Sequence, residues 1–184
     1  MKADWETLYK QGNEEQKIEN YAIAVHLWLK SIEMSQNHAE PFYKLAEYYL
    51  HINAFRLAEA FITAGKKIKK PTKGYIDDDI YEWRFDELNT VLLSYIQPTK
   101  ENLLNGTIET HRILKKYKHR MKDAEITRIE ENHRLFKEAT NLKKDDSVLY
   151  AITRYSSIDV KKREYMKSIR EIWGEEVFDE TMNW

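Results

Sequence analysis

Cysteine is absent from this 184-residue chain, and glycine and proline are scarce, with five and three copies. The missing cysteine excludes disulfides, a thiolate nucleophile and cysteine metal ligands. So few glycines and prolines leave room for few tight turns, which favours long elements. The chain also lacks a long apolar run and any period-two apolar segment bounded by turns, so neither a membrane-spanning helix nor a sheet is expected. We therefore expect an all-α protein.

An excess of charge of one sign is also lacking, because 30 Lys and Arg residues face 31 Asp and Glu residues, giving a net charge of -1. Interspersed charges of both signs argue against wholesale binding of nucleic acid or of an anionic membrane. The start, MKADWETLYK, has no apolar run behind its lysine and predicts no export or membrane signal. Together with the missing cysteine, this makes a cytoplasmic location the expectation.

The stretch 39–71 predicts a helical hairpin around which the rest of the chain is organised. Its apolar residues fall on two helical stripes separated by one short break. Pro41 suits a first helical turn and Asn53 suits a left-handed stop. The first stripe holds Phe42, Leu45, Ala46 and Tyr49, and the second holds Phe55, Ala58, Ile62, Gly65 and Ile68.

An internal repeat links this hairpin to the residues before it. A shift of 34 residues aligns small residues with small ones and large residues with large ones, as expected where two helices approach closely and bulky side chains fill the gaps between repeats. The period is that of a tetratricopeptide repeat. The aligned pairs are Leu8 with Phe42, Gly12 with Ala46, Tyr21 with Phe55, Ala24 with Ala58, Trp28 with Ile62 and Met34 with Ile68.

These patterns predict a right-handed α-solenoid of tetratricopeptide-like helical hairpins with C-terminal capping helices. A hairpin of this kind cannot bury both faces alone, so neighbours of the same kind are required. We expect hairpins at about 5–35, 39–70 and 79–118 and a closing helix at 123–139, all within a repeat region 1–140, followed by 141–184 as a helical cap of the same domain.

No catalytic, cofactor-binding or metal-binding constellation is predicted. Asp77, Asp78 and Asp79 spell the Asp-x-Asp with which glycosyltransferases hold a metal and a sugar diphosphate. No strand precedes them, so capping of the next helix by Asp78 or Asp79 is the better interpretation. The six histidines lack paired metal-ligand spacing.

Two further segments allow alternative interpretations. In the first, around 81–87, Tyr81 and Trp83 either seal a joint between hairpins, with Arg84 paired to nearby acids, or line a groove. In the second, the basic run 111–122 either complements the negative pole of a helix end or binds phosphates.

About two thirds of the chain, residues 20 to 138, resembles the tetratricopeptide-type helical region that accompanies many family 2-like glycosyltransferases. The nucleotide-sugar domain that would precede such repeats is absent, and NTVLLSYIQPTK at 89–100 replaces the expected turn. The resemblance therefore implies a non-catalytic helical region. It is carried by AEPFYKLAEYYL at 39–50, KKIKKP at 66–71, DDDIYEWRFDEL at 77–88 and IEENHRLFKEA at 129–139.

The expected function is a non-enzymatic scaffold or adaptor that binds a peptide or protein partner on its concave helical surface. The alternative is an accessory subunit of a glycosyltransferase system, which only the resemblance supports. Nucleic-acid binding through 111–122 is a third, less favoured hypothesis. The candidate partner-binding residues are Glu40, Tyr43, Glu47 and His51, with Arg84 and Glu87 as less secure additions.

Overall fold

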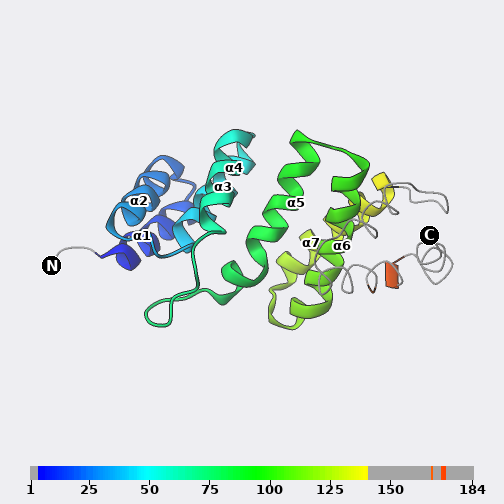
Figure 1. Ribbon diagram of the computed structural model, residues 1–184. Coiled ribbons are helices and arrows are strands. Elements are labelled where there is room, and N and C mark those ends of the chain that lie inside the picture. The colour runs from blue at the N-terminus through cyan, green and yellow to red at the C-terminus, as the bar shows by residue number, and fades with distance from the viewer. Residues whose placement is uncertain (1–3, 141–166, 168–170, 173–184) are drawn as a thin grey trace. The chain divides into compact units, whose positions relative to one another are not determined.

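The computed structural model describes residues 4–140, 167 and 171–172, and these residues form helices and loops without a strand (Figure 1). The expectation of an all-α protein is therefore confirmed for this part of the chain. Contacts divide the protein into two compact units, Met1–Leu92 and Leu93–Trp184. The cap expected at 141–184 lies outside the described residues apart from 167 and 171–172. Every helix in the described ranges is too short or too polar to cross a bilayer.

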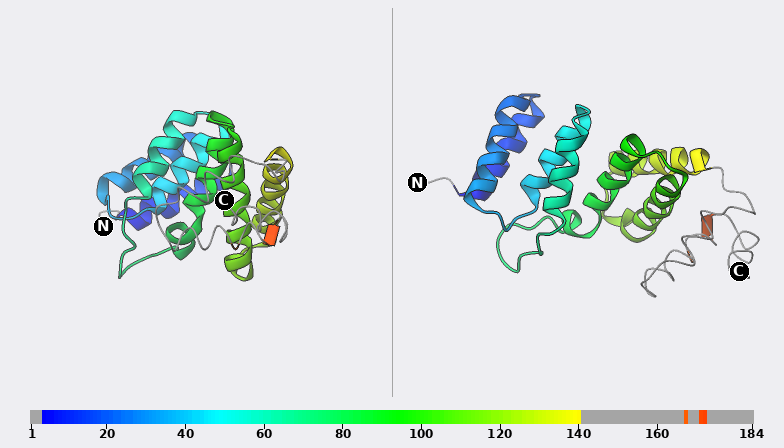
Figure 2. Two further views of the ribbon diagram at one scale, coloured as in Figure 1. Left: turned by 45° about the vertical axis from the view of Figure 1, so that its right-hand side comes forward. Right: turned by 45° about the horizontal axis from the view of Figure 1, so that its top comes forward.

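The first unit begins with two helical hairpins. Helix α1 packs against α2, α3 packs against α4, and α2 contacts α3 (Figures 1 and 2). The hairpins fall within the expected ranges 5–35 and 39–70. Their helices are α1 (Trp5–Lys17), α2 (Tyr21–Met34), α3 (Glu40–His51) and α4 (Phe55–Gly65).

The two hairpins turn in the same way, 34 residues apart. Helices α1 and α3 end at Lys17 and His51, and each is followed by a left-handed residue, Glu19 with φ 61° and Asn53 with φ 59°. The left-handed stop expected at Asn53 is confirmed. The two hairpins therefore share a left-handed turn residue at positions 34 residues apart.

Small residues permit the close packing inside each hairpin. A Cβ on Gly12 would lie 2.6 Å from Nε1 of Trp28, whose indole N–H donates to Asn13 Oδ1 at 3.1 Å. In the second hairpin, Ala58 and Ile62 are 0% and 2% exposed at the positions equivalent to Ala24 and Trp28. The core of the first unit therefore depends on small residues facing large ones.

A long loop leads from α4 to η1 (Ile80–Arg84), a π-helical segment that continues into α5 (Phe85–Ile96). A Cβ on Gly65 would overlap the ring of Phe85, so this glycine allows the start of α5 to approach α4. The Asp77 carboxylate accepts a hydrogen bond from the Asp79 amide at 3.2 Å. Asp77, not Asp78 or Asp79, therefore supplies the cap, because the helical conformation already begins at Asp78.

The second unit contains α6 (Lys100–Tyr117), a short 3₁₀ turn η2 (Lys118–Arg120) and α7 (Asp123–Thr140). Helix α6 packs closely against α7, and a Cβ on Gly106 would lie 2.9 Å from the ring of Phe136. The helix expected to close the repeats at 123–139 is thus the hairpin partner of α6.

The packing of Ala58 leads to a stability prediction. Ala58→Leu should lower the free energy of unfolding by about 1 to 3 kcal/mol, because no space is left for added methylenes. Ala60→Leu, on the exposed side of the same helix, is the matched control and should stay within about 0.5 kcal/mol. Urea denaturation measures both, and equal effects would contradict the packing described for α4.

Candidate functional site

A buried carboxylate lies at the start of α3. Glu40 is 0% exposed, its Oε2 accepts a hydrogen bond from the Tyr81 hydroxyl at 2.9 Å, and its Oε1 accepts one from the Asp77 amide at 3.1 Å. The Tyr81 oxygen in turn accepts from the Ala39 amide at 3.0 Å. We call these four residues the Glu40 junction. It ties the start of α3 to both the α4–η1 loop and η1.

The contacts of the junction match a hydrogen-bond acceptor, Glu40, with donors that include the Tyr81 hydroxyl. Both groups that contact the Glu40 carboxylate are donors, and a carboxylate in the first turn of a helix also meets the positive end of the helix dipole. Burial raises the pKa of Tyr81, and the neighbouring Glu40 raises it further. Tyr81 therefore stays protonated at neutral pH, and its hydroxyl donates a hydrogen bond to Glu40.

Three of the six predicted partner-binding residues are buried in this structure. Glu40, Tyr43 and Glu87 are 0%, 2% and 0% exposed. Glu40 and Tyr43 are covered because η1 contacts α3 and the ring of Phe85 meets Tyr43 edge-on at 5.7 Å, whereas Glu87 is one of the buried residues of α5. A partner cannot reach these three side chains here.

The other three predicted residues are at least partly accessible. Glu47 accepts a hydrogen bond from the Tyr43 hydroxyl at 3.2 Å and pairs with Lys44 at 2.8 Å. His51 is exposed at the end of α3. The guanidinium carbon of Arg84 lies 5.8 Å from the Tyr43 ring centre, and its Nη1 lies 3.8 Å from Asp77 Oδ2, so Arg84 lies beside the covered first turn of α3.

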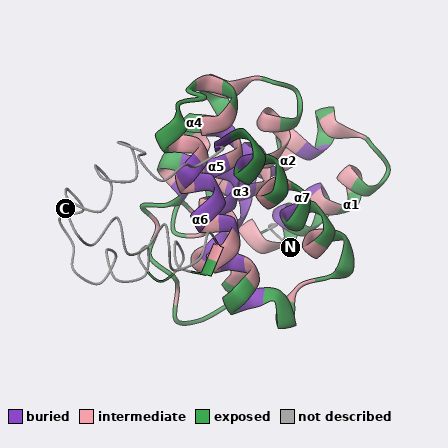
Figure 3. Cartoon of the chain, turned by 90° about the vertical axis from the view of Figure 1, so that its right-hand side faces the viewer, coloured by how far each residue is buried: buried purple, intermediate pink, exposed green. Residues whose placement is uncertain are grey.

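The accessible half of α3 forms a small surface of mixed chemistry, which we call the open α3 face. Tyr48 stacks on Tyr21 from the start of α2, with ring centres 5.3 Å apart, and Tyr21 also lies 6.4 Å from the His51 ring. Sequence reasoning missed Tyr21, Lys44 and Tyr48, although the helical spacing from Lys44 to His51 was available as a signal. The open α3 face consists of Lys44, Glu47, Tyr48 and His51 with Tyr21 beside them. In Figure 3, α3 is coloured mostly as buried or intermediate, with little of it exposed.

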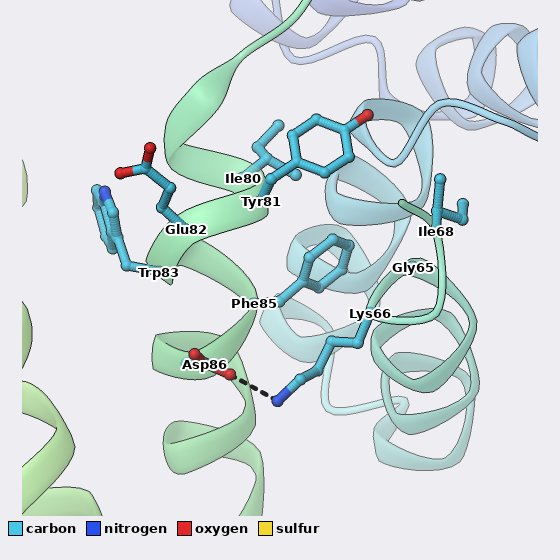
Figure 4. A pocket seen from close by; sticks show the side chains of 9 residues that line it. All are labelled: Gly65, Lys66, Ile68, Ile80, Tyr81, Glu82, Trp83, Phe85 and Asp86. Carbon is cyan, nitrogen blue, oxygen red and sulfur yellow. Dashed lines mark hydrogen bonds and ion pairs between the residues drawn. The ribbon is translucent and has the colours of Figure 1, made fainter. Parts of the chain in front are cut away.

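A pocket of about 130 Å³ lies between the end of α4 and the start of α5 (Figure 4). On the helix formed by η1 and the start of α5, Tyr81 and Phe85 point toward the side that faces the pocket, whereas Glu82 and Trp83 point to the other side. An ion pair of 2.6 Å joins Lys66 to Asp86. Small-molecule sites measure roughly 300 to 1,000 Å³, so this pocket is smaller than a typical ligand site.

The acidic triplet and the basic run are largely accounted for by contacts within the chain. Asp78 pairs with Lys70 at 2.9 Å, and Asp77 caps the next helix. In the described part of the chain, no three His, Asp or Glu side chains are placed to hold a metal ion.

Within 111–122, several cations lie at the end of α6 and face carboxylates. Arg112 pairs with Glu109, Lys115 with Glu171, and Lys118 with Glu130 at 2.6 Å. Burial lowers the pKa of His133, which faces this helix through Thr107 and Thr110. The run is therefore not a continuous positive surface.

Comparison of the chain with family models, curated proteins and solved structures found no match. Function must therefore be argued from the residues of the two units themselves.

The Glu40 junction generates a second prediction. Glu40→Gln and Tyr81→Phe should each destabilise the protein by about 1 to 3 kcal/mol, because each leaves a buried polar group without its partner. The double variant should cost less than the sum, as measured by a double-mutant cycle in urea.

The matched control is Glu6→Gln, since Glu6 lies 34 residues before Glu40 and makes a partly exposed ion pair with Lys10. This substitution should change stability by less than about 1 kcal/mol. Additive effects of Glu40→Gln and Tyr81→Phe would contradict the junction.

Proposed function

We propose that the first unit consists of tetratricopeptide-like hairpins of an α-solenoid and serves as a non-enzymatic protein-interaction module. The observation that carries this proposal is the repetition of hairpin geometry at 34 residues, including the left-handed residues Glu19 and Asn53. Stacked hairpins of this period bind partners with their first helices, which here are α1 and α3.

The open α3 face is the part of this surface that we assign to the partner. It offers two stacked tyrosines, Tyr21 and Tyr48, whose rings supply contact area at a small cost in conformational entropy. Lys44 and Glu47 add one charge of each sign, and His51 adds an exposed polar ring. Such a face suits an extended or helical peptide segment with both apolar and charged side chains.

A peptide selection tests the proposal. A random peptide library displayed on phage is selected on the immobilised chain, and the dissociation constant of the best peptide is measured by fluorescence anisotropy. Tyr48→Ala and His51→Asp should each weaken binding by about five- to thirtyfold, the usual result of losing an anchor residue worth 1 to 2 kcal/mol.

Arg56→Asp is the control for this experiment, because Arg56 is exposed on α4, outside the open α3 face. It should leave the affinity unchanged. The proposal fails if no peptide is selected, or if the selected peptide is insensitive to both α3 substitutions. Thermal melting of each variant separates lost binding from lost folding.

An accessory role in a glycosyltransferase system stays a prediction that rests on the resemblance of residues 20 to 138, in which 77–88 is the most specific run. In that role the chain would dock a catalytic domain and would hold no donor sugar itself. The aspartates of that segment already cap a helix and pair with Lys70 and Arg84. Nothing in the described residues favours nucleic-acid binding by the run 111–122 over the alternative, in which its cations complement the negative pole of a helix end.

A nucleotide sugar with Mn²⁺ should therefore not raise the melting temperature of the chain. A bound donor at a hundredfold excess over its dissociation constant would stabilise the folded state by roughly 2.7 kcal/mol, which is easily measured. A metal-dependent shift that disappears in the double variant Asp77→Ala, Asp79→Ala would overturn the capping role of the triplet.

A further inference from the structure

Tyr75, on the loop between α4 and η1, packs on the first helix of the unit. Its ring centre lies 5.8 Å from that of Tyr9 and 6.4 Å from that of Trp5. Lys10 Nζ lies 5.1 Å from the same ring centre, within the range of a cation–π contact. A loop residue that is distant in sequence thus covers part of α1, the helix equivalent to α3.

The second hairpin has an equivalent contact between aromatic rings, but there the covering residue is more deeply buried. Phe85 meets Tyr43, which is equivalent to Tyr9, but Phe85 is 4% exposed, belongs to a helix and faces Gly65. Tyr75 is only half-buried and lies in a loop without helical hydrogen bonds. It follows Gly74, whose φ of 92° an L-residue rarely adopts, and residues 72–74 are exposed. Phe85 is itself a buried core residue, whereas Tyr75 is a partly buried loop residue that packs against the edge of the core at Tyr9.

We propose that Tyr75 is a built-in occupant of an aromatic-binding site on α1, and that an aromatic side chain of a peptide partner takes its place. The site consists of Trp5, Tyr9 and Lys10. This inference rests on the proposed function, because it describes how the α1 side of the first-helix surface is closed in the absence of a partner.

The chemistry of the site follows from its present occupant. Two aromatic rings accept a third in tilted contact, with interplanar angles of 44° and 54°, and the ammonium group of Lys10 adds a preference for an electron-rich ring. A tethered occupant competes at an effective concentration of about millimolar. A partner's aromatic residue therefore binds the wild-type protein only when other contacts, such as those of the open α3 face, hold it nearby.

The test supplies the loop as a separate molecule. The probe is a peptide with the sequence of residues 72–78, TKGYIDD, capped at both ends. The receptor is the full chain carrying Tyr75→Ala, labelled with ¹⁵N. The indole N–H signal of Trp5, assigned with a Trp5→Phe variant, reports the site. Tyr75→Ala should shift this signal, and millimolar peptide should move it back toward its wild-type position.

Two comparisons make the result specific. The same peptide with alanine in place of tyrosine should leave the Trp5 signal unmoved, and the wild-type protein should respond much less to the tyrosine peptide because its site is already filled. Tyr75→Thr repeats the experiment if Tyr75→Ala does not fold.

The inference is overturned if the tyrosine peptide does not move the Trp5 signal in a folded variant, or if the alanine peptide moves it equally. Either result leaves the binding of a selected peptide to Tyr48 and His51 untouched. Failure of this inference is therefore distinguishable from failure of the proposed function.

Discussion

The carboxylate of Glu40 is the constraint on which the arrangement of the first unit depends. It is fully buried and accepts hydrogen bonds from the Tyr81 hydroxyl and the Asp77 amide, so the start of α3 and the stretch 77–81 meet at one side chain. Burying the Glu40 carboxylate without these donors would be energetically costly, so the hydrogen bonds favour the position of 77–81 against α3. From that point the π-helical turn directs Tyr81 and Trp83 to opposite sides of the helix (Figure 4).

One consequence is that a single helical stripe of α3 has two roles. Its first half, with Glu40 and Tyr43, is covered by η1 and the start of α5 and contributes to stability. Its second half, with Glu47 and His51, remains accessible and forms the surface that we assign to a partner. On α1 the equivalent surface is partly covered by Tyr75. The partner surface that we propose is therefore limited to the part of α3 that η1 and the start of α5 leave accessible.

Local features of the fold could be predicted from the sequence, and contacts between distant segments could not. The positions of the two hairpins, the left-handed Asn53 and the buried Ala58 follow from helical spacing and residue size, which act over a few residues. The bond between Tyr81 and Glu40 joins residues 41 apart, and no periodicity contains it. The repeat positions alone place Glu40 on the binding surface, and they contain no sign of the later segment that covers it. The pairing of α6 with α7 also could not be predicted, because it depends on a contact between residues distant in the sequence, Gly106 and Phe136.

Hydrogen exchange of two backbone amides tests the central role of Glu40 most directly. The amides of Ala39 and Asp77 donate to Tyr81 and Glu40 and take no part in a helical ladder, so only the junction protects them. We predict that both exchange slowly, whereas the amides of the exposed residues Lys73 and Gly74 in the same loop exchange quickly. Equally fast exchange at Asp77 and Lys73 would contradict the account, because it would mean that the loop is not held on α3.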